Sequence, residues 1–201
     1  MKKHIYFLLL SFAALTSTAQ SPIYDISDIR EGIEGSYYKD LNNNLDGYDG
    51  AYLYTEPNNT SFKIVLKKKV LSLNYYYEDL IVGEFQFIRN GIEITNTLAN
   101  INNKYTNEKV NHTITGNFIL TGTTWGCPDC SPTEKRLRLS LIDHKSQNIV
   151  GLDIRKTKVN NIPAIKVLIF GEEYHSTPNP DGSRSTDSYM LELGEYTMIK
   201  Q

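Results

Sequence analysis

The stretch from Gly50 to Leu98 constrains the fold most, because aromatic and β-branched residues alternate there with polar ones between turn signals. A period of two is typical of a strand with one buried face. Phe62, Ile64 and Leu66 share one such face. Asn90-Gly91 predicts a type I′ turn, since both residues readily adopt the positive φ angles that this turn requires. The stretch therefore predicts an antiparallel β-meander.

Further strands are predicted at fairly even spacing along the rest of the chain. They cover His112–Gly122, Arg136–Leu141, Ile149–Arg155, Ile162–Phe170, Tyr189–Leu193 and Tyr196–Ile199. About nine or ten short strands with little helical periodicity are typical of a β-barrel or a β-sandwich. We expect one all-β domain over residues 50–201, as a lipocalin-like antiparallel barrel, because closure removes exposed strand edges. A β-sandwich remains the alternative.

Two local features of the central stretch carry predictions of their own. In Leu80–Ile88 the apolar side changes at Gly83, which predicts a β-bulge, a common role for an isolated glycine in a strand. The basic run Lys67–Lys69 is interpreted as a solvated strand end that blunts an edge.

The N-terminal segment has the pattern of a secretory signal. A basic start at Lys2-Lys3 precedes the apolar run Ile5–Leu15, and small residues end the pattern at Ala19. We therefore expect a signal peptide over residues 1–19 and an exported protein, periplasmic or extracellular. No later segment approaches the roughly 20 apolar residues of a membrane helix. Residues 20–49 form a lead-in, with a short helix predicted at Ser27–Glu34 from apolar spacings of three and four.

Charge and motifs argue against several classes of function. The formal net charge is −2, with 23 acidic and 21 basic residues, which argues against nucleic acid or an anionic membrane as the main partner. No G-x-S-x-G, H-E-x-x-H or phosphate-binding glycine loop occurs. We expect no catalytic residue and no cofactor. The carboxylates near the predicted strands are interpreted as solvated surface: Glu78, Asp79, Glu84, Glu172 and Glu173.

Cys127-Pro128-Asp129-Cys130 is the most motif-like segment, and it holds both cysteines of the chain. Our leading interpretation is a local disulfide in an oxidising compartment. A thioredoxin-type redox pair would sit at a helix N-terminus, whereas a strand-like segment follows here. A zinc site would need two more ligands, and the histidines that could supply them are His112, His144 and His175. The redox and metal interpretations stay open as alternatives.

Tyrosine is unusually frequent, with 14 residues, and its ring combines apolar area with a hydroxyl suited to ligand and glycan surfaces. These rings could equally fill a β core. The candidate ligand-binding residues are Tyr52, Tyr54, Tyr76, Trp125, Tyr174 and His175.

Several segments together resemble a family of small exported proteins from Bacteroidota with a domain of unknown function. They are Ala19-Gln20 at the end of the signal, Ser61–Lys69, Tyr76–Glu93 and Gly194–Gln201. The resemblance implies an exported β-rich domain and no activity. Separately, Gly50-Ala51-Tyr52 is similar to the Gly-x-Trp start of lipocalin-type barrels, with Tyr in place of Trp.

The sequence leads to one main functional hypothesis and two alternatives. The main hypothesis is a non-enzymatic exported binding module for a small apolar molecule, a glycan or a surface protein. One alternative is a periplasmic redox or metal-binding protein built on Cys127 and Cys130. The other alternative is a structural envelope component. A filled core would favour this alternative, whereas an apolar cavity would favour the binding module.

Overall fold

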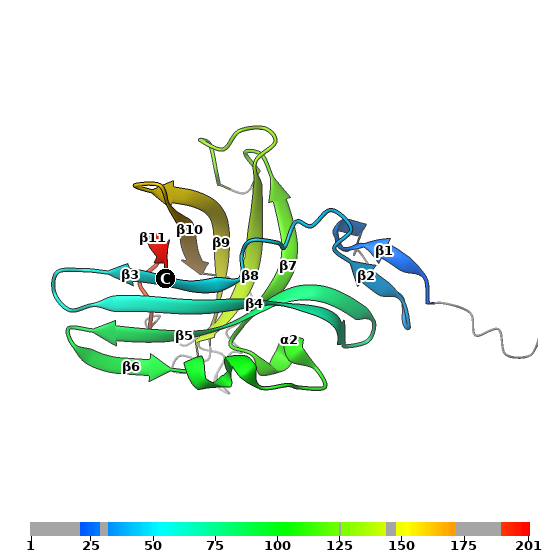
Figure 1. Cartoon of the computed structure of the whole chain (residues 1–201), viewed down its shortest axis with the longest axis horizontal. Helices are drawn as coiled ribbons and strands as arrows, with labels where there is room; N and C mark the ends of the chain where they lie inside the picture. The colour runs from blue at the N-terminus through cyan, green and yellow to red at the C-terminus, as the bar shows by residue number, and fades with distance from the viewer. Residues whose placement is uncertain (1–20, 29–31, 125, 144–147, 172–189) are drawn as a thin grey trace, which may run out of the picture.

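Eight strands close into an antiparallel barrel in the computed structural model (Figure 1), which describes residues 21–28, 32–124, 126–143, 148–171 and 190–201. The barrel strands are β3 (Gly50–Thr55), β4 (Ser61–Leu73), β5 (Tyr77–Arg89), β7 (Ile114–Thr121), β8 (Lys135–Asp143), β9 (Asn148–Val159), β10 (Ile162–Gly171) and β11 (Gly194–Lys200). Each pairs with the next barrel strand along the chain, and β11 returns to β3. The all-β, lipocalin-like barrel is confirmed, and the β-sandwich alternative is wrong.

Strand β5 is the point at which other segments join the barrel. One edge pairs with β4 along most of its length. The other edge pairs in turn with β2 (Tyr37–Lys39), with β7, and with β6 (Ile92–Asn96). The tight β5–β6 turn has the positive φ angles expected at Asn90 and Gly91, 52° and 78°. The hairpin therefore extends β5 beyond the barrel wall, while β7 closes the barrel.

The barrel interior is packed with apolar side chains from the inward faces of the strands. Phe62 and Ile64 of β4 lie opposite Phe87 and Phe85 of β5, as the alternation predicts. The largest buried side chains of this core include Tyr48, Tyr52, Phe62, Ile64, Leu66, Phe85, Ile114, Leu137 and Leu139. Burying one such side chain stabilises the fold by roughly 1.5–3 kcal/mol. The core of the domain is the inside of the barrel.

The lead-in segment packs against the barrel and contributes side chains to its core. Leu45 and Tyr48, just before β3, are buried in the same core. Strand β1 (Ile23–Asp25) pairs in parallel with β2, which continues the sheet from β5 (Figure 1). In place of the helix expected at residues 27–34, the described residues form one 3-10 turn, η1 (Ile26–Asp28), and a turn at Glu34-Gly35.

The β-bulge expected at Gly83 is wrong. The β4–β5 register runs without a break through Leu66 and Gly83, and its shift lies between Lys69 and Ser72. Leu80 and Val82 point outward yet are buried, because two segments cover this wall: η2 (Leu98–Asn102) and α2 (Glu108–Asn111). Strand β5 thus has buried residues on both faces, because both faces are covered.

The lysines at residues 67–69 also lie within β4 and not at a strand end. Lys67 donates to Asn102 at 2.6 Å, which ties η2 to the wall. Lys68 forms an ion pair with buried Asp40 at 2.9 Å in the lead-in. The expectation of a solvated edge is wrong, because these cations hold the covering segments in place. Among the described residues, no helix has the length and apolar character needed to span a bilayer.

Gly83→Ala should destabilise the protein by about 2 kcal/mol, the scale of an overpacked core. An added Cβ would lie 3.0 Å from the Val65 carbonyl oxygen and 3.2 Å from Ile114 Cβ, where the barrel closes. Chemical denaturation measures the loss. Gly151→Ala is the comparison, because its added Cβ meets the ring of Phe170, a side chain that can turn away. Equal losses in the two variants would contradict this account of Gly83.

Candidate functional site

A pocket of about 120 Å³ opens at the end of the barrel where β3 ends and β11 begins. Three inward-facing rings form its aromatic part: Tyr54, Phe87 and Tyr196. Its polar rim comes from the β3–β4 turn, the β5–β6 turn and the approach to β11, and includes Glu56, Asn58, Arg89, Asn90 and Glu192. We call this pocket the barrel mouth.

The rings of the mouth are fixed by the core beneath them. Tyr54 and Tyr196 meet edge to face with centroids 5.0 Å apart. Phe62, which is fully buried, contacts both Tyr196 and Phe87 in the same T-shaped manner, at 5.8 and 6.4 Å. Such offset contacts favour defined ring positions. The mouth therefore has a preformed aromatic floor.

The charged groups of the mouth act on the two tyrosines. The Tyr54 hydroxyl donates to Glu56 Oε1 at 2.8 Å, and this hydrogen bond raises the pKa of Tyr54. The Tyr196 hydroxyl donates to the Glu192 carbonyl oxygen at 2.7 Å. Burial, and then the charge of Glu192, raise the pKa of Tyr196 to about 12. Both phenols are therefore neutral hydrogen-bonding groups at neutral pH.

Arg89 is the one basic residue that lines the mouth in the described part of the chain. Its Nη2 donates to the carbonyl oxygen of Met190 at 2.8 Å, and its guanidinium lies 5.2 Å from the ring centroid of Phe87. This geometry is a cation–π contact. The arginine holds the segment before β11 against the end of β5.

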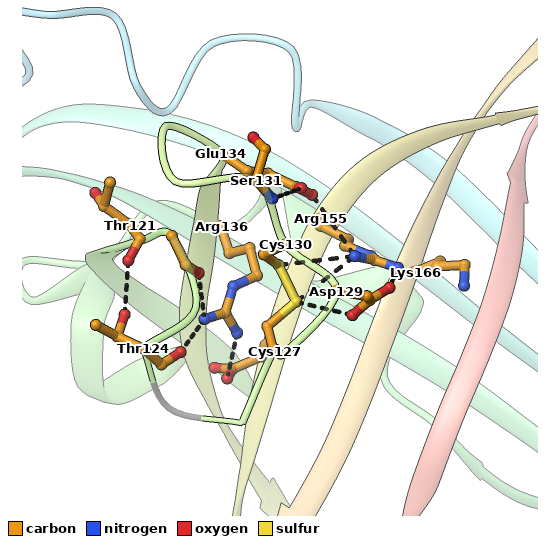
Figure 2. Close-up of a disulfide and its surroundings, with 12 residues drawn as sticks. Thr121, Thr124, Cys127, Asp129, Cys130, Ser131, Glu134, Arg136, Arg155 and Lys166 are labelled. Carbon is orange, nitrogen blue, oxygen red and sulfur yellow. Dashed lines mark hydrogen bonds and ion pairs between the residues drawn. A yellow bond between two sulfur atoms is a disulfide. The ribbon is translucent and has the colours of Figure 1, made fainter.

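Cys127 and Cys130 form a disulfide in the loop that joins β7 to β8, with Cα atoms 5.4 Å apart. Figure 2 shows the loop folded over the outer wall of the barrel, with the guanidinium of Arg155 beside both sulfurs. Arg155 Nη1 lies 3.6 and 3.7 Å from the two Sγ atoms, and Nη2 donates to Asp129 at 2.9 Å. Arg155 thereby lowers the pKa of Asp129.

A second arginine, on strand β8, anchors the same loop. Arg136 is buried, and its Nη2 donates to the carbonyl oxygens of Gly122 and Thr124 (Figure 2). Asp153 on β9 accepts from Arg136 at 3.3 Å and from Arg138 at 2.6 and 2.7 Å. Nothing in the local sequence marks Arg136 or Arg138 as an anchor for a loop. The alternation in residues 136–141 is typical of a strand with one outward face, but no local pattern shows that a loop covers that face.

The surroundings of the disulfide favour a structural role over the redox and metal alternatives. Both cysteines are buried, at 7% and 5% exposure, which limits attack by an external thiolate. In the described part of the chain, Cys127, Asp129 and Cys130 form the one group of three residues with metal-ligand spacing. Sulfurs bonded to each other are not thiolate ligands, and the positive charge of Arg155 opposes a second cation there.

The tyrosines proposed as ligand residues do not gather in one place. Tyr52 is buried in the core, where its hydroxyl donates to the Tyr48 carbonyl oxygen at 3.1 Å, so the structure argues against a role at a ligand. Tyr54 lies in the mouth. Tyr76 packs against Tyr38 at 4.9 Å and lines a groove beside η1 and β7, near the opposite end of β5. Outside the described residues lie Trp125, Glu172, Glu173, Tyr174 and His175.

The carboxylates on β5 are buried and satisfied, so their interpretation as solvated surface is wrong. Glu78 accepts from Lys109 at 2.9 Å and from Asn117 at 2.8 Å. Asp79 accepts from the hydroxyl of Tyr37 at 2.6 Å. The covering segments remove these groups from water, and each therefore needs partners within the chain.

Glu84 belongs to a buried polar network on the outer wall. His112 Nδ1 lies 2.9 Å from Glu84, and Nε2 lies 2.9 Å from Glu108. The imidazole therefore bridges two carboxylates. Burial opposes ionisation of Glu108, but hydrogen bonds from Lys69 and His112 outweigh it and lower the pKa of this carboxyl. The network clamps α2 to the barrel.

Comparison with known proteins places the chain in a family. A family model described as "Family of unknown function (DUF6705)" matches residues 1–201. The chain belongs to this family. No curated protein and no solved structure matches it. The family description assigns no activity.

We expect no free thiol in the purified protein, native or denatured, by titration with a thiol reagent. Replacing both cysteines by serine should lower the free energy of unfolding by about 2 kcal/mol, since the closed loop is short. The Arg136 and Arg155 contacts would still hold the loop. Titratable thiols in the untreated native protein would contradict the structural role.

His112→Ala should destabilise the protein by about 3 kcal/mol, because buried Glu84 loses the imidazole nitrogen that lies 2.9 Å from it. Urea denaturation at neutral pH gives the loss. Lys166→Ala is the matched control, since it breaks an ion pair with Glu195 at 2.9 Å that is partly exposed to solvent, and such pairs contribute about 0–1 kcal/mol. A loss no larger in His112→Ala than in the control would refute the clamp.

Proposed function

We propose that the protein is an exported, non-enzymatic binding module that takes a sugar residue of a glycan in its barrel mouth. One observation carries the proposal: a preformed pocket with an aromatic floor and a polar rim lies at the end of a barrel whose interior is filled. Binding sites typically combine apolar and aromatic walls with a few oriented polar groups. The mouth has this composition.

The filled interior favours a sugar over an apolar ligand of the lipocalin kind. Phe62 and Phe85 are fully buried inside the barrel just below the mouth. Their side chains occupy the space in which a lipocalin binds its ligand. The rim offers carboxylates, side-chain amides and a guanidinium, which match the donors and acceptors of a hydroxyl-rich ring. A pocket of this size is small compared with the roughly 300–1,000 Å³ of drug-sized sites, and it suits a single ring.

Export is supported by the pattern of residues 1–19 and by the disulfide, a bond that persists in oxidising compartments. A structural envelope component is the second candidate. The same filled interior supports it, since such a protein needs no ligand.

Tyr54→Ala should weaken sugar binding about tenfold, the equivalent of about 1.4 kcal/mol, because it removes one ring of the aromatic floor. The measurement is an NMR titration with a panel of mono- and oligosaccharides. Tyr54→Phe keeps the ring and should retain more of the affinity. Tyr75→Ala is the matched control, since Tyr75 is 59% exposed and precedes β5, at the opposite end of that strand from the mouth.

Equal affinities for Tyr54→Ala and Tyr75→Ala would place the sugar outside the mouth. A protein that binds no sugar in the panel and self-associates in sedimentation would instead fit the structural envelope component.

A further inference from the structure

The barrel mouth holds two carboxylates that have no basic partner among the described residues. Glu56 accepts the hydroxyl of Tyr54 but forms no ion pair there, and the carboxylate of Glu192 is exposed at the rim. Arg89 lines the same pocket, yet its Nη2 donates to the Met190 carbonyl oxygen. The lining therefore carries two negative charges, on Glu56 and Glu192, and one positive charge, on Arg89. The guanidinium of Arg89 is hydrogen-bonded to a backbone carbonyl oxygen.

The rings of the mouth add to this negative potential. The face of an aromatic ring attracts a cation, and more strongly when water is partly excluded. Arg89 demonstrates the effect at this site, since its guanidinium lies over Phe87. Glu56 and Glu192 both act electrostatically on the phenols of Tyr54 and Tyr196, and Arg89 offsets only part of this effect at Tyr196. The pocket thus pairs π faces with anions.

We infer that the sugar bound in the mouth carries a protonated amino group, and that Glu56 and Glu192 recognise its ammonium beside the rings of Tyr54 and Tyr196. The inference rests on the proposed function and names the class of sugar. Charge-assisted hydrogen bonds from an ammonium to a carboxylate are roughly twice as strong as neutral ones. The hydroxyls of the same ring can pair with Asn58 and Asn90 at the rim.

An organic ammonium fits this chemistry better than a metal ion. Calcium takes six to eight oxygen ligands, whereas aromatic rings make up a large part of the mouth. An ammonium needs few oxygen acceptors and gains from the rings.

The test compares three sugars that differ only at carbon 2: glucose, glucosamine and N-acetylglucosamine. NMR titration of the full mature chain at neutral pH and low salt should show glucosamine binding about tenfold tighter than the other two. Raising the ionic strength should reduce this preference, because salt screens partly exposed charges.

Glu192→Gln should reduce the ratio of glucosamine to glucose affinity severalfold, since it removes one of the two negative charges and keeps the shape of the side chain. Because Glu192 is exposed, the substitution should leave the fold intact, and thermal unfolding of the variant checks this. Glu195→Gln is the matched control, because Glu195 lies three residues away and pairs with Lys166 on the outer wall. The control should keep the tenfold ratio.

The possible results separate the two claims. Equal affinity for the three sugars, or tighter binding of N-acetylglucosamine, overturns the amino-sugar inference and leaves the proposed function standing. A preference for glucosamine that is undiminished in Glu192→Gln also overturns it. Failure of the wild-type protein to bind any of the three, or any glycan of the wider panel, overturns both.

Discussion

Pairing along both edges of β5 is the constraint on which the rest of the structure depends. This strand of 13 residues pairs with β4 on one side and with β2, β7 and β6 in turn on the other. It closes the barrel through β7, anchors the lead-in through β2 and extends past the wall with β6. Because η2 and α2 cover its outer face, polar groups there are buried. The imidazole of His112 between Glu84 and Glu108 is a consequence of that cover.

The parts of the fold that depend on local sequence pattern could be predicted. The parts that depend on a segment from elsewhere in the chain packing over a strand could not. Alternation at Phe62, Ile64 and Leu66 set the inward face of β4, and Asn90-Gly91 set the turn after β5. Gly83 was misinterpreted as a bulge because the sequence does not show that a polar segment 15 to 30 residues later folds back over β5. A strand covered on both faces loses its alternation, and this loss resembles an irregularity of the strand itself.

Only part of the candidate site was accessible from the sequence, for a related reason. Tyr54 stood out because tyrosine suits ligand surfaces, but the same argument selected Tyr52, which the alternation of β3 places two residues deeper in the core. Phe87, Arg89 and Tyr196 come from strands far apart in the chain. They meet at the mouth only because the closed register brings the end of β5 and the start of β11 to the same rim as the end of β3. That register is set by the whole barrel and not by any one segment.

The two kinds of carboxylate in this protein differ in whether the chain itself neutralises them. Glu84 and Asp79 are removed from water, and hydrogen-bond donors surround each one, since an unpaired buried charge would be strongly destabilising. Glu56 and Glu192 lie at an open rim, where water offsets their charge, and no basic residue in the described part of the chain forms an ion pair with either. Glu56 accepts the Tyr54 hydroxyl, but no ion pair among the described residues uses the charge of either group. Their charge is therefore free to serve a ligand, and the complement of that charge is a cation.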